Sequence, residues 1–305
     1  MSAINARNTH PLIRKLETVF PLSDEERKAI LALPIDQRVI EAHQDIVREG
    51  DRPSRSFVIA DGVACAFKMT GEGKRQILAF HITGDMPDLQ SLHLQTLDIS
   101  IGTITACKVG FIQHEDLQRL CERQARVAAA LWRETLIYAA MFREWITNIG
   151  RRQALGRAAH FMCEYIVRAR AMGLVEDYSC ELPITQEELS DAMGLSIVHV
   201  NRVLQELRKL GLINLESRHL TVLDWTGSRK SETSTRDTST CRRRPRSVTP
   251  LRQTAARTDE QRAAHEPLRP SAIPETALGQ VGILHSLKNA AAGESSFVSS
   301  APPIS

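Results

Sequence analysis

The chain has 305 residues, of which 42% are hydrophobic and 25% are charged, a composition typical of a soluble globular protein with one large core or two ordinary ones. Its formal net charge of +3 comes from the carboxyl end, because residues 227–305 hold 12 Lys and Arg against 7 Asp and Glu, while residues 1–226 hold 27 against 29. This balance excludes a strongly basic protein, so nucleic-acid affinity in residues 1–226 would have to come from a local patch.

Cysteine usage and hydropathy indicate the compartment. The 6 cysteines are scattered without a CxxC pair, which argues against a zinc ribbon, a thioredoxin motif or a disulfide framework. The amino terminus lacks the apolar stretch of a signal peptide, and no apolar run approaches the length of a membrane span. We therefore expect a soluble cytoplasmic protein that does not associate with a membrane.

The first part of the chain predicts a short helical lead-in over residues 1–20 and an antiparallel β-barrel of the jelly-roll type over residues 21–114. Turn signals recur between residues 48 and 88, and the segments between them are rich in β-branched and aromatic residues. "MTGEGKR" at residues 69–75 predicts a hairpin. Short strands at such regular spacing are typical of a barrel or jelly roll.

A long helix is expected over residues 115–149, where neither proline nor glycine occurs. Six positions at alternating steps of four and three keep one seam on one face, and such a seam favours a homodimer contact over packing on the barrel. These positions are Leu131, Thr135, Tyr138, Phe142, Trp145 and Ile149.

Residues 150–226 predict a winged helix-turn-helix. After a helix over residues 150–174, we expect a short strand at residues 182–184 and a helix that begins at Thr185, with Glu188 completing a capping box. A turn at residues 193–195 and a second helix from Ser196 follow. Two strands, at residues 212–215 and 220–223, would form the wing.

The second of these helices separates two chemistries. Apolar side chains at steps of three and four form one face, while polar groups gather on the other face near its start, where a helix-turn-helix meets the major groove. Arg202 has the donors for guanine and Asn201 the donor and acceptor for adenine. The full set of predicted DNA contacts is Thr185, Gln186, Ser196, Ile197, Val198, His199, Asn201, Arg202 and Arg218.

Beyond Trp225 the pattern ends. Residues 227–305 hold 20 Ser and Thr and 7 of the 13 prolines, so we predict a disordered tail, whose basic run at residues 242–246 is a solvated segment or a nonspecific DNA contact. A second hypothesis is that this composition reflects an out-of-frame reading of the gene, which a comparison of the other coding frames would test.

The order of barrel, long helix and winged helix resembles the Crp/Fnr family of bacterial transcription regulators over about residues 10–226. The resemblance is carried by "REGD" (48–51), "TGEGKRQI" (70–77), "ITGDMPDL" (82–89) and "ITQEELSDAMGLSIVHVNRVLQEL" (184–207). It implies an α+β fold and a homodimer that binds double-stranded DNA and works with RNA polymerase, and in which a signal in the barrel reorients the DNA readers.

The departures from the family pattern narrow this expectation. Cyclic-nucleotide binders of the family use a glutamate and an arginine in the segment that here spans residues 84–107, which contains neither, so we expect no binding of cyclic AMP. The clustered cysteines of iron–sulfur sensors are missing near the amino terminus, and the barrel histidines are isolated, so we expect no cofactor and no metal. Many family members carry glutamate where Val198 stands, so the usual operator does not transfer.

Two other functions remain open from the residues alone. One is a winged helix that recognises a protein. The other is a jelly-roll metal enzyme of the cupin type, which would need a close group of His and Glu ligands that the barrel segment lacks. We expect a regulator rather than an enzyme.

Overall fold

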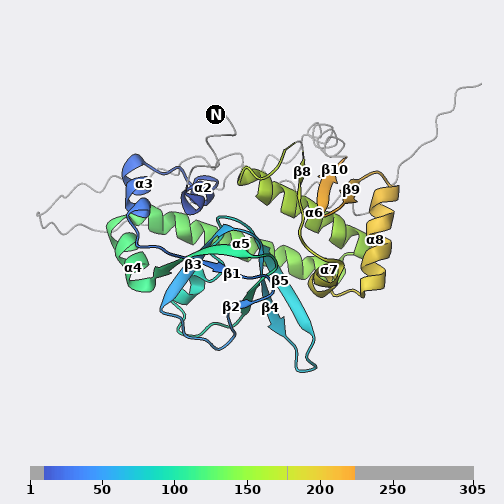
Figure 1. The fold of residues 1–305 in the computed structure, drawn as a ribbon, viewed down its shortest axis with the longest axis horizontal. Coiled ribbons are helices and arrows are strands. Elements are labelled where there is room, and N and C mark those ends of the chain that lie inside the picture. The colour runs from blue at the N-terminus through green and yellow to red at the C-terminus, as the bar shows by residue number, and fades with distance from the viewer. Residues whose placement is uncertain (1–9, 177, 224–305) are drawn as a thin grey trace, which may run out of the picture.

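The computed structural model describes residues 10–176 and 178–223. The predicted tail over residues 227–305, its basic run and the frame hypothesis therefore lie outside the described residues. The barrel lies below the long helix α5 in Figure 1, and the winged-helix part lies at the right-hand end of the molecule.

Seven strands build the barrel and confirm the expected antiparallel architecture. They are arranged in two sheets, with the orders β1-β7-β3 and β2-β6-β4-β5. Their bounds are β1 Asp36–Ile40, β2 Asp45–Val47, β3 Arg55–Asp61, β4 Ala64–Met69, β5 Arg75–His81, β6 Ser100–Thr103 and β7 Cys107–Gln113. The predicted hairpin joins β4 to β5, and the amide of Thr70 donates to the carbonyl of Lys74 at 2.8 Å.

The barrel interior is apolar. Phe57, Ile59, Leu97, Ile101 and Phe111 belong to one buried cluster that fills the space between the two sheets. Leu97 comes from the segment after the "TGD" turn, and only 2% of it is exposed. The interior is therefore occupied by the chain's own side chains.

The segment that begins at the "TGD" turn covers the free edge of β3. The amide of Gly84 donates to the carbonyl of Ile59 at 2.7 Å, and the amide of Ile59 donates to the carbonyl of Asp85 at 3.0 Å. The amide of Phe57 donates to the Asp88 carboxyl at 3.1 Å. Burial raises the pKa of the Asp88 carboxyl to about 8.

The predicted single helix over residues 115–149 is wrong in one respect, because the structure divides it into α4 His114–Arg123 and α5 Ala125–Arg151. Gln124 leaves the helical region, with φ −126° and ψ 76°. The break lets Leu117 of α4 and Leu131 of α5 both enter the cluster that also holds Leu16. The described residues of the amino-terminal part also form helices α2 Pro11–Glu17 and α3 Asp24–Leu31 and the 3₁₀ helix η1 Leu89–Leu92.

The predicted seam on α5 divides into two rows. Leu131 and Trp145 are buried within the chain, 6% and 7% exposed, and Tyr138 of the same row is half-buried. Thr135, Phe142 and Ile149 are exposed. The first row therefore packs against the rest of the chain, and the second row remains on the surface. The large apolar side chains left exposed on this helix, here called the α5 face, are Trp132, Leu136, Phe142, Ile146 and Ile149.

The winged-helix part contains α6 Ala154–Ala171, α7 Gln186–Met193, α8 Ile197–Lys209 and a small sheet. The sheet has the order β8-β10-β9, with β9 Ile213–Glu216 and β10 His219–Val222 close to the predicted positions. The predicted strand at residues 182–184 is wrong by three residues, because β8 spans Ser179–Glu181. Pro183 has no amide to donate to a ladder, so the pairing ends before it. Among the described helices, none has the length and apolar character needed to cross a bilayer.

Candidate nucleic-acid interface

Local hydrogen bonds build the helix-turn-helix. Thr185 caps α7 through the predicted capping box with Glu188, whose carboxylate accepts from the Thr185 amide at 2.6 Å. Gly194 ends α7 with φ +63°, a left-handed conformation that glycine adopts without strain. Ser196 caps α8 and accepts from the His199 amide at 3.3 Å. The turn between the helices is therefore specified by neighbouring residues.

Helix α8 has the two faces that the sequence predicted. Val200, Val203, Leu204 and Leu207 are all less than 5% exposed and pack in the winged-helix core. The opposite face lies at the outer edge of the molecule in Figure 1. The structure therefore turns the first two turns of α8 outward.

The predicted contact residues on α8 fall into two groups. Ser196, Ile197, Val198, His199 and Arg202 are exposed, with Ile197 at 49% and Val198 at 63%. Exposed aliphatic side chains beside an arginine suit the thymine methyl and guanine edges of a major groove. This group is available to a partner as the helix stands.

Asn201 is placed differently from the other predicted contacts. It is half-buried, and its amide nitrogen donates to the side-chain oxygen of Gln186 at 3.1 Å. The bond ties the first turn of α7 to α8 and uses one of the two donor hydrogens of the Asn201 amide. Thr185 is exposed, but its hydroxyl already serves the capping box.

The wing is a tight hairpin between β9 and β10. Ser217 and Arg218 both have positive φ, 49° and 65°. The Arg218 carbonyl accepts a hydrogen bond from the Leu182 amide at 2.7 Å, which holds the backbone of the turn in place. The Arg218 side chain itself is exposed. Arg218 therefore lies at the tip of the wing, as expected.

Three contacts that the sequence did not predict hold the end of α7. Arg75 of β5 pairs with Asp191 at 2.7 Å, and the Gln76 amide nitrogen donates to the Ala192 carbonyl at 3.2 Å. From α6, Arg157 donates to the Met193 carbonyl at 2.9 Å. The barrel and α6 thus both contact the residues that lead into the turn. Arg75 and Gln76 belong to the "TGEGKRQI" segment, which the sequence singled out only as a family motif and not as a contact with α7.

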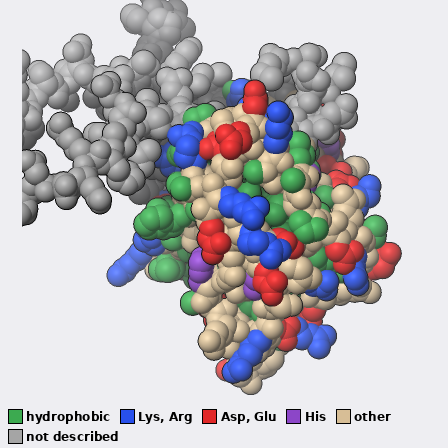
Figure 2. All heavy atoms as spheres, turned by 90° about the vertical axis from the view of Figure 1, so that its left-hand side faces the viewer, with side chains coloured by type: hydrophobic (Ala, Val, Ile, Leu, Met, Phe, Trp, Pro, Cys, Tyr) green, Lys and Arg blue, Asp and Glu red, His purple; other side chains and the backbone are tan. Residues whose placement is uncertain are grey.

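Positive and negative side chains are mixed on the end of the molecule that lies opposite to α8. Figure 2 views the end that carries α3 and α4, where Lys and Arg side chains alternate with Asp and Glu among apolar ones. The described residues on this face form no field of one sign that would attract DNA. In residues 10–176 and 178–223 no group of three or more His, Cys, Asp or Glu is placed to hold a metal, so the cupin alternative has no ligand set there.

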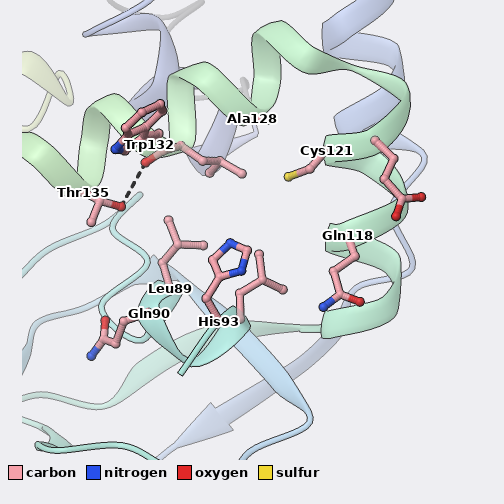
Figure 3. Close-up of a pocket in the computed structure, with 11 residues that line it drawn as sticks. Leu89, Gln90, His93, Gln118, Cys121, Ala128, Trp132 and Thr135 are labelled. Atoms are coloured by element: carbon pink, nitrogen blue, oxygen red, sulfur yellow. Dashed lines mark hydrogen bonds between the residues drawn. The ribbon is translucent and has the colours of Figure 1, made fainter. Parts of the chain in front are cut away.

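A cavity of about 580 Å³ lies between η1 and helices α4 and α5. Leu89 and His93 point into it from one side, and Cys121 and Trp132 approach from the helices (Figure 3). Thr135, which donates to the Leu131 carbonyl at 3.1 Å, also lines it and lies at the left in Figure 3. The cavity therefore adjoins the α5 face.

The fold and the interface define a winged-helix DNA-binding protein with a barrel of the cyclic-nucleotide-binding type. The Crp-like helix-turn-helix domain model matches residues 156–227, and the cyclic nucleotide-binding domain model matches residues 37–124. The chain belongs to the Crp/Fnr family and is a non-enzymatic, DNA-binding transcription regulator.

The relatives are distant in sequence, but the matched regions cover most of the length of each relative. The transcriptional activator protein anr of Pseudomonas aeruginosa is 24% identical over 187 residues, which cover 61% of this chain and 76% of the relative. A probable transcriptional activator of Rhizobium leguminosarum bv. viciae is 27% identical over 189 residues, which cover 62% and 78%. The solved structure of FixK2 from Bradyrhizobium japonicum is similar with a TM-score of 0.58 at 21% identity, over 68% of this chain and 100% of that one.

Proposed function

We propose that the protein acts as a homodimer that reads an inverted-repeat DNA sequence, with α8 of each subunit in the major groove. The observation that carries this proposal is the exposed side of the first two turns of α8, which presents Ile197, Val198 and Arg202. In a two-fold symmetric dimer, the half-sites lie about one helical turn of DNA apart.

Selection of the purified full chain on random duplexes at near-physiological salt tests this function. We expect enrichment of a short inverted repeat with centres roughly 10 base pairs apart. The alternative, a winged helix that binds a protein, is favoured by the exposed Ile197 and Val198. Binding without sequence preference, unaffected by a change at Arg202, would support that alternative.

The α5 face is the proposed dimer contact. Trp132, Leu136 and Ile146 are 69%, 55% and 70% exposed, and large apolar side chains gathered on one face of a monomer mark interaction surfaces. Phe142 and Ile149 extend the same face, which adjoins the cavity beside η1. A second copy would bury these side chains against their counterparts.

Ile146→Glu is expected to convert the dimer to a monomer, because it places a charge in the middle of the apolar contact. Light scattering after size exclusion would show the molar mass fall by half. Leu31→Glu is the matched control, since Leu31 is also exposed, at 59%, but lies on α3. An unchanged mass for Ile146→Glu would contradict the assignment of this face.

We also propose that the barrel does not bind cyclic AMP. Its interior is filled by apolar side chains such as Phe57 and Leu97, and the charge of Asp85 is paired with the chain's own cations. Isothermal titration of the dimer with cyclic AMP is expected to give no saturable heat. A saturable isotherm with one site per subunit would contradict this expectation.

A regulator of this kind works beside the chromosome, so we place the protein in the cytoplasm and propose RNA polymerase as its partner on promoter DNA. Polymerase binding to a selected operator fragment, with and without the protein, would test the partnership. Equal polymerase occupancy in the two cases would argue against it.

A further inference from the structure

A buried carboxylate lies where the main parts of the molecule meet. Asp85, in the turn after β5, is fully buried and forms ion pairs with two cations from elements far apart in the chain. Lys15 of α2 lies 3.0 Å from one oxygen, and Arg168 of α6 lies 2.6 Å from the other. Arg168 also donates to the carbonyl of Phe80 in β5 at 2.8 Å. One side chain thus links the lead-in helix, the barrel and the winged-helix part.

Helix α5 takes part in the same cluster. Lys15 pairs with Glu134 at 2.8 Å, and the Tyr138 ring centre lies 5.5 Å from the Lys15 ammonium and 5.9 Å from the Arg168 guanidinium. Such distances allow cation–π attraction. The helix that carries the proposed dimer face is therefore bound to the same cations as the winged-helix part.

The backbone at the turn makes this meeting possible. Gly84 has φ +94°, and a Cβ there would collide with the methyl group of Met172, at the end of α6, and would lie 3.0 Å from the Cβ of Lys15. A larger residue would press on α2 through the Cβ of Lys15 and the carbonyl of Pro11, whereas the Met172 methyl is the end of a flexible side chain and can move aside. Glycine at residue 84 is thus required by close packing as well as by its dihedral angle.

A buried ionic cluster of this kind specifies geometry more than it adds stability. Removing charges from water is costly, so the pairing is favourable only when donors and acceptors lie in one arrangement, whereas apolar packing tolerates small shifts. Arg168 can reach Asp85 and the Phe80 carbonyl together only when α6 lies at one position against β5.

We propose that Lys15, Asp85 and Arg168, here called the ionic joint, fix the orientation of the winged-helix part relative to the barrel and α5, so that Lys15 and Arg168 are positioning residues for DNA binding. The inference rests on the proposed function as a dimeric reader of an inverted repeat. The two recognition helices must reach successive major grooves at a set spacing, and the joint sets that spacing within each subunit.

The readout that separates positioning from folding is the comparison of a full inverted repeat with a single half-site. Two linked readers gain affinity only while their geometry allows both to engage at once. Arg168→Met is expected to lower full-site affinity by about tenfold or more and to leave half-site affinity unchanged. It should also abolish the preference for one spacer length among operators whose half-sites are one or two base pairs closer or farther apart. Lys15→Met should act in the same direction.

The experiment uses the full chain, with fluorescence anisotropy on labelled duplexes and a thermal melt of each variant. Arg170→Met is the matched control, because Arg170 lies on the same helix but is exposed. Arg168→Lys should restore part of the spacer preference, since it keeps a charge that reaches Asp85. The double variant Asp85→Asn with Arg168→Met removes both charges, and decides the matter if Arg168→Met alone fails to fold.

The outcomes distinguish the joint from the function on which it rests. A wild-type protein that binds the full repeat no better than a half-site would overturn the dimeric reader itself. If the wild type prefers the full repeat, and the folded Arg168→Met or double variant keeps the same affinity ratio and spacer preference, the ionic joint is overturned. An equal loss of half-site and full-site affinity in a folded variant would also overturn it.

Discussion

Arg202→Ala is expected to lower the affinity for the selected operator by about 30-fold or more. Each good bidentate contact with a guanine contributes about 1–3 kcal/mol of discrimination, and a two-fold operator contains two such contacts. Arg202 is exposed near the start of α8, so its removal leaves the buried face of the helix unchanged. Anisotropy titrations of operator and random duplexes, at one fixed salt concentration, would measure the loss.

The same titrations need a control for the lost charge. Lys209→Ala removes one positive charge from the same helix, but at its last turn and away from the first two turns. We expect it to weaken operator and random DNA by similar small factors, as a phosphate contact would. If Arg202→Ala also weakened both duplexes equally, Arg202 would be a phosphate contact and not a base reader.

Asp85→Ala is expected to lower the free energy of unfolding by about 3–5 kcal/mol, because it leaves two buried cations without their shared partner. The side chains of Lys15 and Arg168 are only 10% and 6% exposed, so bulk water has little access to their charges. Urea denaturation followed by circular dichroism would measure the change. Asp98→Ala, at an exposed position, is the control and should have an effect within about 0.5 kcal/mol.

The acid sensitivity of the protein should depend on the same carboxylate. Burial alone would raise the pKa of Asp85, but the charges of Lys15 and Arg168 outweigh it and hold the pKa well below the ordinary value of 3.8. A carboxyl group with a lowered folded-state pKa stabilises the fold above its unfolded pKa, and this contribution is lost as the pH falls below that value. The stability difference between wild type and Asp85→Ala should therefore shrink below about pH 4. A difference that stays constant down to pH 3 would contradict the ionic role.

The helix-turn-helix was predictable because its signals are local. Thr185 with Glu188, Gly194 at the turn and Ser196 before α8 each act on backbone groups three or four residues away, so sequence order alone places them. The same holds for the apolar spacing of α8 and for the turn signals of the barrel. These features determined the fold class and the outward position of Arg202.

The helix over residues 115–149 shows where local signals end. Its pattern identified a helix with an apolar seam, but neither proline nor glycine marks the break at Gln124. The spacing of apolar residues also could not tell which row would be buried in the chain, because Trp145 and Phe142 lie on neighbouring rows of the same helix. Packing against the rest of the chain decided that Trp145 is buried and that Phe142 and Ile146 remain exposed.

The sequence by itself therefore determined the order of the parts and the chemistry of the DNA-facing helix, since both depend on residues close together in the chain. Only the tertiary structure decided how the parts are joined. Asp85 meets Arg168 across 83 positions, and Arg75 meets the end of α7 across 116. Side chains so far apart in sequence leave no periodic signal, because their contact depends on how whole elements pack and not on the spacing within any one of them.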